Sequence, residues 1–184
     1  MARIGKSLPI ADELAAAAAG AAGLLMSEAT VAETLKLITA AAKSSVPFAI
    51  GAGVTLMDAN ARPTSAAASD EVVEQADSLQ YDLEQGPCLS AWATGETVVV
   101  QDIAADDRWP EWSRLVAPLA VAASISVPLK SSSESFGAVK VYAAEPQAFT
   151  ERSRGVLELL ARQASVLLEH AITAEQAKKV SEEL

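Results

Sequence analysis

The apolar residues of this chain recur with two different periods, and each period predicts one kind of secondary structure. Between residues 30 and 45 they recur every three or four positions, which predicts a helix with one apolar face. This helix begins with a capping box, because the Thr30 hydroxyl and the Glu33 carboxylate can satisfy free amides of its first turn. A long helix is predicted from Thr150 to near the C-terminus, where apolar residues follow a heptad. The residues of this seam are Leu157, Leu160, Ala164, Leu167, Ala171 and Ala174. The first half of the seam can cover the chain's own sheet, and the second half can pair with a second copy.

Alternating apolar and polar residues predict five strands. Their ranges are 48–57, 64–69, 97–102, 123–129 and 136–143. The first strand has one bulky face and one face of small residues, on which Gly51 and Gly53 indicate the close approach of a helix, a ligand or another backbone. Because hairpins and short helices join these strands, the sequence predicts an α+β fold with a central antiparallel sheet.

Residues 81–95 predict a short helical lid rather than another strand. Pro87 stands where the first residue of a helix is favoured, and Gly95 stands where its left-handed cap would be. The same stretch contains Cys88, the single cysteine. All three tryptophans lie between residues 81 and 112. A segment of this kind covers either a ligand cavity or ordinary core, and the pattern leaves both open.

Composition narrows the classes of protein that the chain can belong to. The 184 residues suffice for one domain with helical extensions, and the alanine-rich residues 12–26 predict such an extension at the N-terminus. A net charge of −10 argues against nucleic-acid binding by this chain itself. No apolar run reaches the ~20 residues of a membrane span, and Asp12 and Glu13 interrupt the only candidate signal peptide. A single cysteine suits a reducing cytoplasm.

Several short motifs occur in an order that resembles a GAF domain. They are Tyr81-Asp82-Leu83, Gly86-Pro87-Cys88, Arg108-Trp109-Pro110, Ser126-Val127-Pro128-Leu129, Phe136-Gly137-Ala138 and Phe149-Thr150. The order is most similar to that in actinobacterial regulators that carry an RNA-binding ANTAR domain, although the arginine that many relatives have before the Ser-Val-Pro strand is replaced within Ala120–Ala123. The resemblance divides the chain into an N-terminal helical extension (1–29), a GAF sensory domain (30–174) and the start of a linker or projecting helix (175–184).

The resemblance implies a PAS-related fold with a five- or six-stranded sheet. Terminal helices pack on one face of the sheet, and loops and short helices roof a ligand pocket on the other. The candidate pocket residues beneath this roof are Thr55, Tyr81, Cys88, Trp92, Trp109, Trp112, Ser124, Ser126 and Lys140. Cys88 is either a reactive thiol at a helix start or a small packed sulfur, and packing is favoured. The Lys140 ammonium group must form an ion pair, reach solvent or bind an anionic ligand. We expect it to reach solvent by its long side chain.

The chain lacks the residues that most GAF-domain cofactors and reactions need. His170 is the only histidine and lies far from Cys88 in sequence, which removes the usual haem, metal and Cys-His arrangements. Bilin-attachment, cyclic-nucleotide and phosphate-loop signatures are also absent. The sequence therefore predicts no cofactor, no metal and no enzymatic activity.

The resulting hypothesis is a cytoplasmic, non-enzymatic sensory module that does not bind membranes. It would bind an unidentified small ligand and form a homodimer through its terminal helices. It would control an RNA-binding antitermination output (an ANTAR domain) that this chain does not contain. Two alternatives stay open: a structural dimerisation module without a physiological ligand, and a thiol redox sensor or enzyme that uses Cys88.

Overall fold

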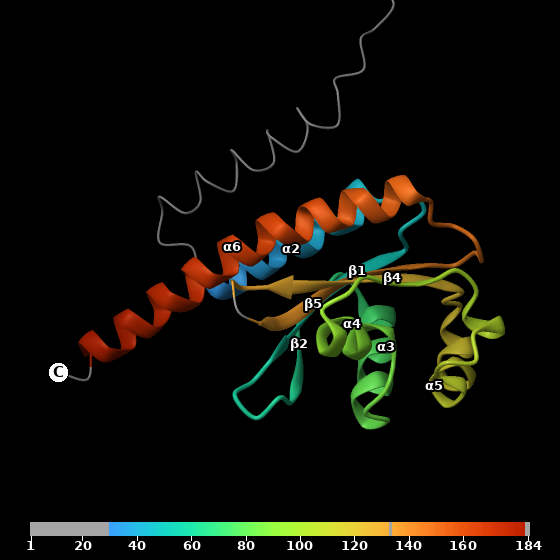
Figure 1. Cartoon of the computed structure of the whole chain (residues 1–184), viewed down its shortest axis with the longest axis horizontal. Helices are drawn as coiled ribbons and strands as arrows, with labels where there is room; N and C mark the ends of the chain where they lie inside the picture. The colour runs from blue at the N-terminus through green and yellow to red at the C-terminus, as the bar shows by residue number, and fades with distance from the viewer. Residues whose placement is uncertain (1–29, 133, 183–184) are drawn as a thin grey trace, which may run out of the picture.

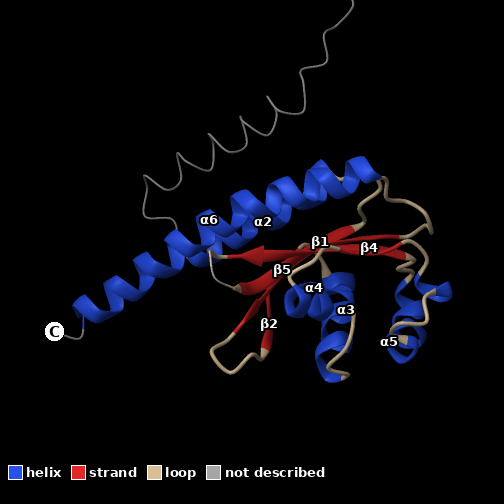
Figure 2. Cartoon of the chain, in the orientation of Figure 1, coloured by secondary structure: helices blue, strands red, loops and turns tan. Residues whose placement is uncertain are grey.

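A single antiparallel sheet lies between two layers of helices (Figures 1 and 2). The computed structural model describes residues 30–132 and 134–182, so the predicted helical segment 12–26 lies outside the described residues. The strands are β1 (Gly51–Met57), β2 (Pro63–Ala68), β3 (Val98–Val100), β4 (Ala123–Lys130) and β5 (Ser135–Ala143). Their order across the sheet is β2-β1-β5-β4-β3. The predicted α+β fold with an antiparallel sheet is confirmed.

The first and last described helices cover one face of the sheet. They are α2 (Val31–Ser45) and α6 (Glu151–Glu182), and α2 begins with the predicted capping box. Their apolar residues pack with those of the sheet in one core, to which Val54, Ile125, Val139 and Val141 contribute. Alternation along the strands sends these four side chains to the same face. The predicted placement of the terminal helices is therefore confirmed.

Helix α6 uses most of its heptad seam on its own sheet. Leu157, Leu160 and Ala164 are buried there, as predicted for the first half of the seam. Ala171, expected to face a second copy, is also buried within the chain, which leaves Leu167 half-buried and Ala174 exposed. Burial of Ala171 within the chain removes it from the surface that could pair, and pairing by the rest of the second half of the seam stays a prediction.

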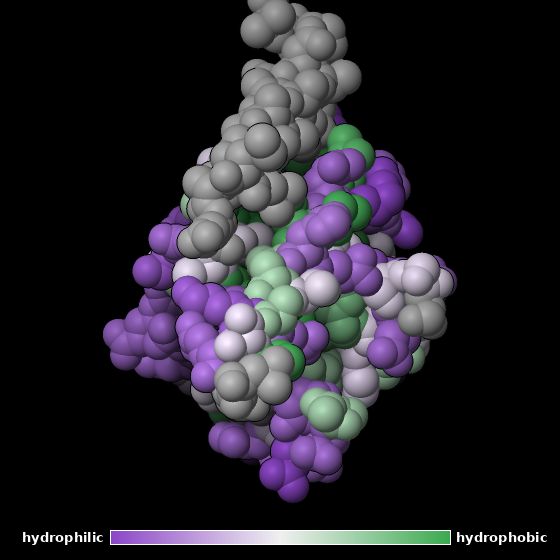
Figure 3. All heavy atoms as spheres, turned by 90° about the vertical axis from the view of Figure 1, so that its left-hand side faces the viewer, coloured by the Kyte–Doolittle hydropathy of each residue, from purple (hydrophilic) through white to green (hydrophobic). Residues whose placement is uncertain are grey.

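The C-terminal end of α6 projects beyond the sheet (Figure 1). In the C-terminal part of α6, Glu175 Oε1 accepts a hydrogen bond of 2.9 Å from the Val31 amide at the start of α2. Hydrophilic side chains cover most of the end from which α6 projects, with small separate hydrophobic areas between them (Figure 3). None of the described helices is long and apolar enough to cross a membrane.

Three helices form the layer on the opposite face of the sheet. These lid helices are α3 (Glu71–Asp82), α4 (Pro87–Thr94) and α5 (Pro110–Val116), and short 3₁₀ turns flank α5 at Ile103–Ala105 and Ala117–Leu119. Asp70 caps α3 by accepting a hydrogen bond from the Val73 amide. Gly95 ends α4 in the left-handed conformation, with φ of 67°. The predicted lid of short helices is therefore confirmed.

The glycines of β1 allow α3 to pack directly on the sheet. A Cβ atom at Gly51 would lie 2.5 Å from Val73 Cγ2, and one at Gly53 would lie 2.8 Å from Val73 Cγ1. Of the three close neighbours predicted for these glycines, the structure shows two: the helix α3 at both positions and, at Gly53, the backbone of β2, whose Ala67 carbonyl oxygen would lie 2.9 Å from an added Cβ atom.

The Gly137→Ala variant tests how closely β1 and β5 are packed. A Cβ atom at Gly137 would collide with the Thr55 carbonyl oxygen, so we expect the free energy of unfolding in urea to fall by about 1–3 kcal/mol. The matched control is Gly155→Ala in α6, where nothing lies within 4 Å of the added atom. This control should gain about 0.5–1 kcal/mol from helix propensity. Equal effects of the two substitutions would contradict the packing described here.

Candidate functional site

A network of polar side chains is buried between the sheet and the helices α3 and α4. Its members are Thr55 on β1; Asp77, Gln80 and Tyr81 on α3; Cys88 on α4; and Lys140 and Tyr142 on β5. All of them except the half-buried Tyr81 are at most 1% exposed. The three α3 residues share one helical face because their spacing is three and four. Lys140 and Tyr142 share the lid face of β5 because they alternate with Val139 and Val141.

An ion pair between Lys140 and Asp77 is the centre of this network. Lys140 Nζ lies 2.5 Å from Asp77 Oδ2, and it donates a hydrogen bond of 2.6 Å to Thr55 Oγ1. The expectation that Lys140 reaches solvent is therefore wrong, since its side chain is 0% exposed. The small residue beside it explains the difference. A Cβ atom at Gly53 would lie only 3.0 Å from Lys140 Cε, so the glycine leaves space for the lysine stem to turn toward α3.

A second branch of the network connects α3 to the start of α4. The Tyr142 hydroxyl donates to Asp77 Oδ1 at 3.1 Å and accepts from Gln80 Nε2 at 3.0 Å. Gln80 Oε1 in turn accepts the Cys88 amide at 2.9 Å. Gly86, the residue before α4, has no side chain with which to cap this helix. Gln80 therefore supplies the cap from α3, and the two helices are joined through it.

The charge on Lys140 determines the direction of the hydrogen bonds around Thr55. An ammonium group can only donate, so Thr55 Oγ1 is an acceptor toward Lys140. The Cys88 thiol also donates to Thr55 Oγ1, at 3.5 Å. The single hydroxyl hydrogen of Thr55 is then available for the Tyr81 hydroxyl, 2.5 Å away. The chain of donors thus runs from the buried ammonium to a tyrosine at the edge of the network.

Burial and the ion pair set the protonation states in the site. Burial by itself lowers the pKa of Lys140, but the adjacent Asp77 carboxylate outweighs this effect and the pKa is raised. Burial raises the pKa of the Cys88 thiol and of the Tyr81 and Tyr142 hydroxyls. At neutral pH the lysine is therefore charged, and the thiol and both phenols are protonated.

Two serines next to the ion pair have no hydrogen-bond partner. Ser124 lies opposite Tyr142 and Ser126 opposite Lys140 in the register between β4 and β5. Both are 0% exposed, and among the described residues their hydroxyl oxygens contact no donor or acceptor. Leaving a buried hydroxyl unpaired costs about 1–3 kcal/mol. The hydroxyls of Ser124 and Ser126 are therefore available to a hydrogen-bond partner from outside the described residues.

The predicted aromatic residues do not line one shared hollow. Trp112 is 0% exposed and donates to the Ala76 carbonyl at 3.2 Å, and Trp109 packs beside it in the apolar cluster that contains Tyr142. Trp92 instead donates to the Ser135 carbonyl at 2.9 Å and lines a surface groove of about 530 Å³. Trp109 and Trp112 belong to the core because α5 packs against α3.

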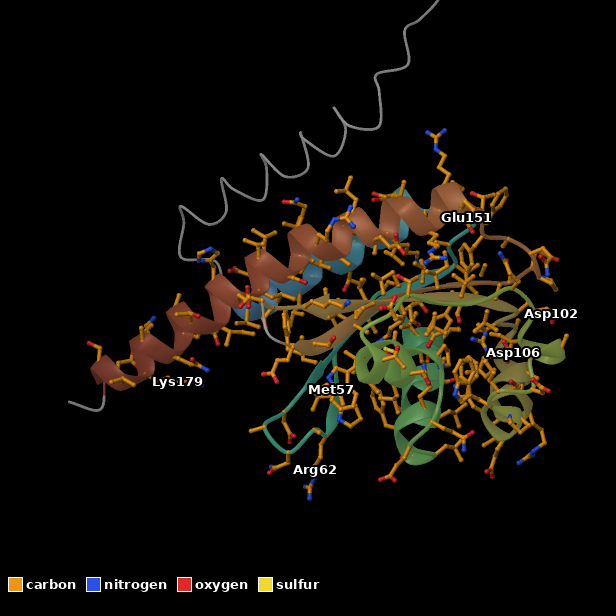
Figure 4. All side chains as sticks on the ribbon, viewed as in Figure 1. Met57, Arg62, Asp102, Asp106, Glu151 and Lys179 are labelled. Atoms are coloured by element: carbon orange, nitrogen blue, oxygen red, sulfur yellow. The ribbon has the colours of Figure 1, made fainter. Side chains whose placement is uncertain are left out.

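The outer end of the lid layer has a separate polar cluster. Arg108 pairs with Asp106 and lies 4.6 Å from the Trp109 ring centroid. Asp102 and Asp106 lie at the α5 end of this layer (Figure 4). Within residues 30–132 and 134–182, no group of three or more metal-ligating side chains could hold a metal ion.

Three members of the buried network were absent from the sequence-based candidates. These are Asp77, Gln80 and Tyr142. A signal existed for each of them. Asp77 and Gln80 lie within one turn of Tyr81 on a helix, and Tyr142 alternates with Lys140 on a strand. The sequence analysis lacked one criterion: a polar residue on the same helix or strand face as a candidate site residue is itself a candidate.

Substitutions in the ion pair test its energetic role. Lys140→Met or Asp77→Asn should each lower the free energy of unfolding by about 3–5 kcal/mol, because each leaves one buried charge uncompensated. The double variant should lose less than the sum of the two singles, by at least about 2 kcal/mol. Urea denaturation of the four proteins measures this coupling. Strict additivity would show that the pair does not act as a unit.

The reactivity of Cys88 tests whether its thiol is shielded. At pH 8 we expect a chromogenic disulfide reagent to modify the native protein at least about 100-fold more slowly than the urea-unfolded protein. Burial and the raised pKa are the physical reason. Absorbance during the reaction provides the rate, and the unfolded protein serves as the control. Similar rates for both forms would mean that α4 opens freely.

Solved structures with a similar fold come from sensors and from enzymes. A putative GAF sensor protein from Burkholderia vietnamiensis is 20% identical, with a TM-score of 0.65, over 97% of this chain and 99% of that one. A free methionine-R-sulfoxide reductase from Neisseria meningitidis, solved with its substrate, is 19% identical with a TM-score of 0.67, over 94% and 98%. A domain of a putative two-component sensor histidine kinase protein from Sinorhizobium meliloti is 19% identical with a TM-score of 0.62, over 80% and 95%. A search of curated proteins found no match.

The comparisons correct one expectation. The sequence predicted no enzymatic activity, but the reductase from Neisseria meningitidis and two further neighbours of the same name are enzymes with this fold. The fold is therefore compatible with catalysis, and the inference from missing cofactor motifs was wrong.

The family assignment depends on the sequence as well as on the fold. A family model described as a GAF domain matches residues 28–169, which is most of the chain. The narrower resemblance to regulators with an ANTAR domain is not part of these findings and stays a prediction. The chain belongs to the GAF domain family.

Proposed function

We propose that this GAF domain is a sensory module that binds a small polar molecule beneath α3 and α4. The observation that supports this proposal is the pair of unpartnered hydroxyls of Ser124 and Ser126, buried beside Lys140 and Tyr142. A ligand with hydrogen-bond acceptors would satisfy both hydroxyls. Because Lys140 is already neutralised by Asp77, the ligand is either uncharged or replaces the Asp77 carboxylate with its own.

Binding at this position would change contacts on both faces of the sheet. Any shift of Lys140 or Tyr142 alters hydrogen bonds to α3, and Gln80 passes the change from α3 to α4. On the other face, Val139 and Val141 of the same strand pack in the core with α2 and α6. In the proposed mechanism, the ligand shifts the balance between two packing arrangements that differ in the position of the terminal helices.

The terminal helices would pass the signal to an output through a homodimer. Leu37 on α2 and Val166 and Val180 on α6 are exposed large apolar residues that suit such contacts. The projecting end of α6 is suited to connect to a further domain. The resemblance to antitermination regulators favours an RNA-binding ANTAR output, which this chain would control without binding RNA itself.

The competing proposal is a structural dimerisation module that needs no ligand. A redox sensor that uses Cys88 has less support, since the thiol is protonated and 1% exposed in this structure. Such a sensor would require α4 to open before the thiol could react.

A thermal-shift screen tests ligand binding at the two serines. The probes are panels of amino acids, small carboxylic acids and sugars, with tryptophan fluorescence as a second signal. A true ligand at 100 times its Kd should raise Tm by roughly 5–10 °C, which corresponds to about 2.7 kcal/mol. Ser124→Ala and Ser126→Ala should abolish most of this shift without lowering the Tm of the free protein, because each removes an unpaired hydroxyl.

The matched control is Ser181→Ala on the exposed projecting end of α6, which should leave the ligand-induced shift unchanged. If no probe moves either signal, the structural dimerisation module becomes the better reading.

A further inference from the structure

A second candidate site lies outside the buried network, at the free edge of the sheet. A groove of about 390 Å³ runs between α2 and β2, and we call it the β2 groove. Its lining residues are Lys36, Thr39, Ala40, Lys43, Ser44 and residues 67–69. Most of the lining surface is apolar, and two lysines lie along its α2 side.

Strand β2 has an unpaired edge. It is the outermost strand of the sheet and pairs only with β1. Unpaired edges are templates for additional strands, and proteins usually block them with charged side chains, proline or a covering element. The half of β2 beside the groove consists of three alanines, Ala66, Ala67 and Ala68, and has none of these side chains. Its half-buried alanines therefore leave space for another backbone.

The charge of the β2 groove is opposite to that of the whole chain. The chain has a net charge of −10, but Glu33 is the only acidic residue of α2, against Lys36 and Lys43. The two lysines are seven residues apart, which is two helical turns, so they lie on the same side of α2. Lys43 contacts Asp70 at 3.4 Å in an exposed pair, and pairs of this kind contribute little and exchange readily. Among the described residues, Lys36 has no ion-pair partner.

We propose that the β2 groove binds an extended acidic segment of a partner protein, which adds a strand to the edge of β2. Backbone hydrogen bonds to the unpaired edge would provide affinity, as in other cases of strand addition. Acidic side chains on one face of the segment would meet Lys36 and Lys43. Small apolar side chains on the opposite face of the segment would pack beside Ala68, which packs against the apolar cluster on the lid side.

Other occupants fit the groove less well. A small inorganic anion would leave the apolar floor of alanines uncovered. A nucleic acid would meet two lysines on a strongly acidic protein, which is too little positive charge for phosphate-backbone binding. A second copy of this chain, paired edge to edge, would bring the same lysines toward each other across the interface. An acidic partner segment satisfies the charges and the free edge together.

Peptide selection on the whole chain tests the proposal. A phage library of linear twelve-residue peptides is selected on the wild-type protein, and enriched peptides are synthesised and measured by fluorescence anisotropy. We expect peptides in which acidic residues alternate with small apolar residues. Their Kd should rise at least about tenfold for the variant Lys36→Glu/Lys43→Glu, because like charges then face each other. The matched control, Lys178→Glu/Lys179→Glu on the projecting end of α6, should change the Kd less than about twofold at the same net charge.

Hydrogen exchange identifies the mode of binding. Strand addition should slow amide exchange in β2 when the selected peptide binds, whereas adhesion to the lysines alone would not. The proposal is overturned if selection yields no acidic peptides, if the peptides bind both charge-reversal variants equally, or if β2 gains no protection. A wild-type dimer that Lys36→Glu/Lys43→Glu dissociates, with no peptide bound, would identify a second copy as the occupant and would also overturn it.

Discussion

The arrangement of the lid depends on one buried ion pair, between Lys140 on β5 and Asp77 on α3. Moving each charge out of water costs several kcal/mol, and the attraction between them offsets this cost only when further hydrogen bonds complete both groups. Thr55 and Tyr142 supply these bonds from β1 and β5. Few other placements of α3 would satisfy all of these groups. The pair therefore specifies where the helix lies more than it adds to overall stability.

Small residues around the pair make this arrangement possible. Gly53 leaves space for the lysine stem, and Gly86 allows Gln80 to reach the first amides of α4. Cys88 and Ala91 have small side chains, so α4 packs closely on the sheet at Ala138. A thiol at this position fits the small space and keeps its proton. Close packing and buried polarity together explain why Ser124 and Ser126 are cut off from water without a partner.

The GAF fold by itself does not decide what this site does. Proteins of the same architecture are named as sensors and as reductases, at sequence identities near 20% that show the fold alone. The distinguishing features are local to this chain: a neutralised lysine, two unpaired hydroxyls and a shielded thiol. On the other side of the sheet, the same strand β5 contacts the core beneath the terminal helices. A single strand thus connects the candidate site with the helices that would carry a signal.

Local patterns were enough to identify the elements of the fold, because the interactions that define them lie close together in the sequence. The capping box at Thr30, the proline and glycine that bound α4, and the alternation of β5 each act within a few residues. The motif order also indicated the GAF family. The sequence by itself thus determined the strands and the terminal and lid helices, and its resemblance to GAF domains implied the side of the sheet on which they pack. Tertiary structure alone decided the partners of the buried polar groups. Lys140 and Asp77 are 63 residues apart, and no local pattern shows that the lysine turns inward beside Gly53 instead of reaching water. Tertiary structure also decided the separation of Trp92 from Trp109 and Trp112. Trp92 lies on α4 and the other two lie at α5, and these helices pack against different parts of the protein.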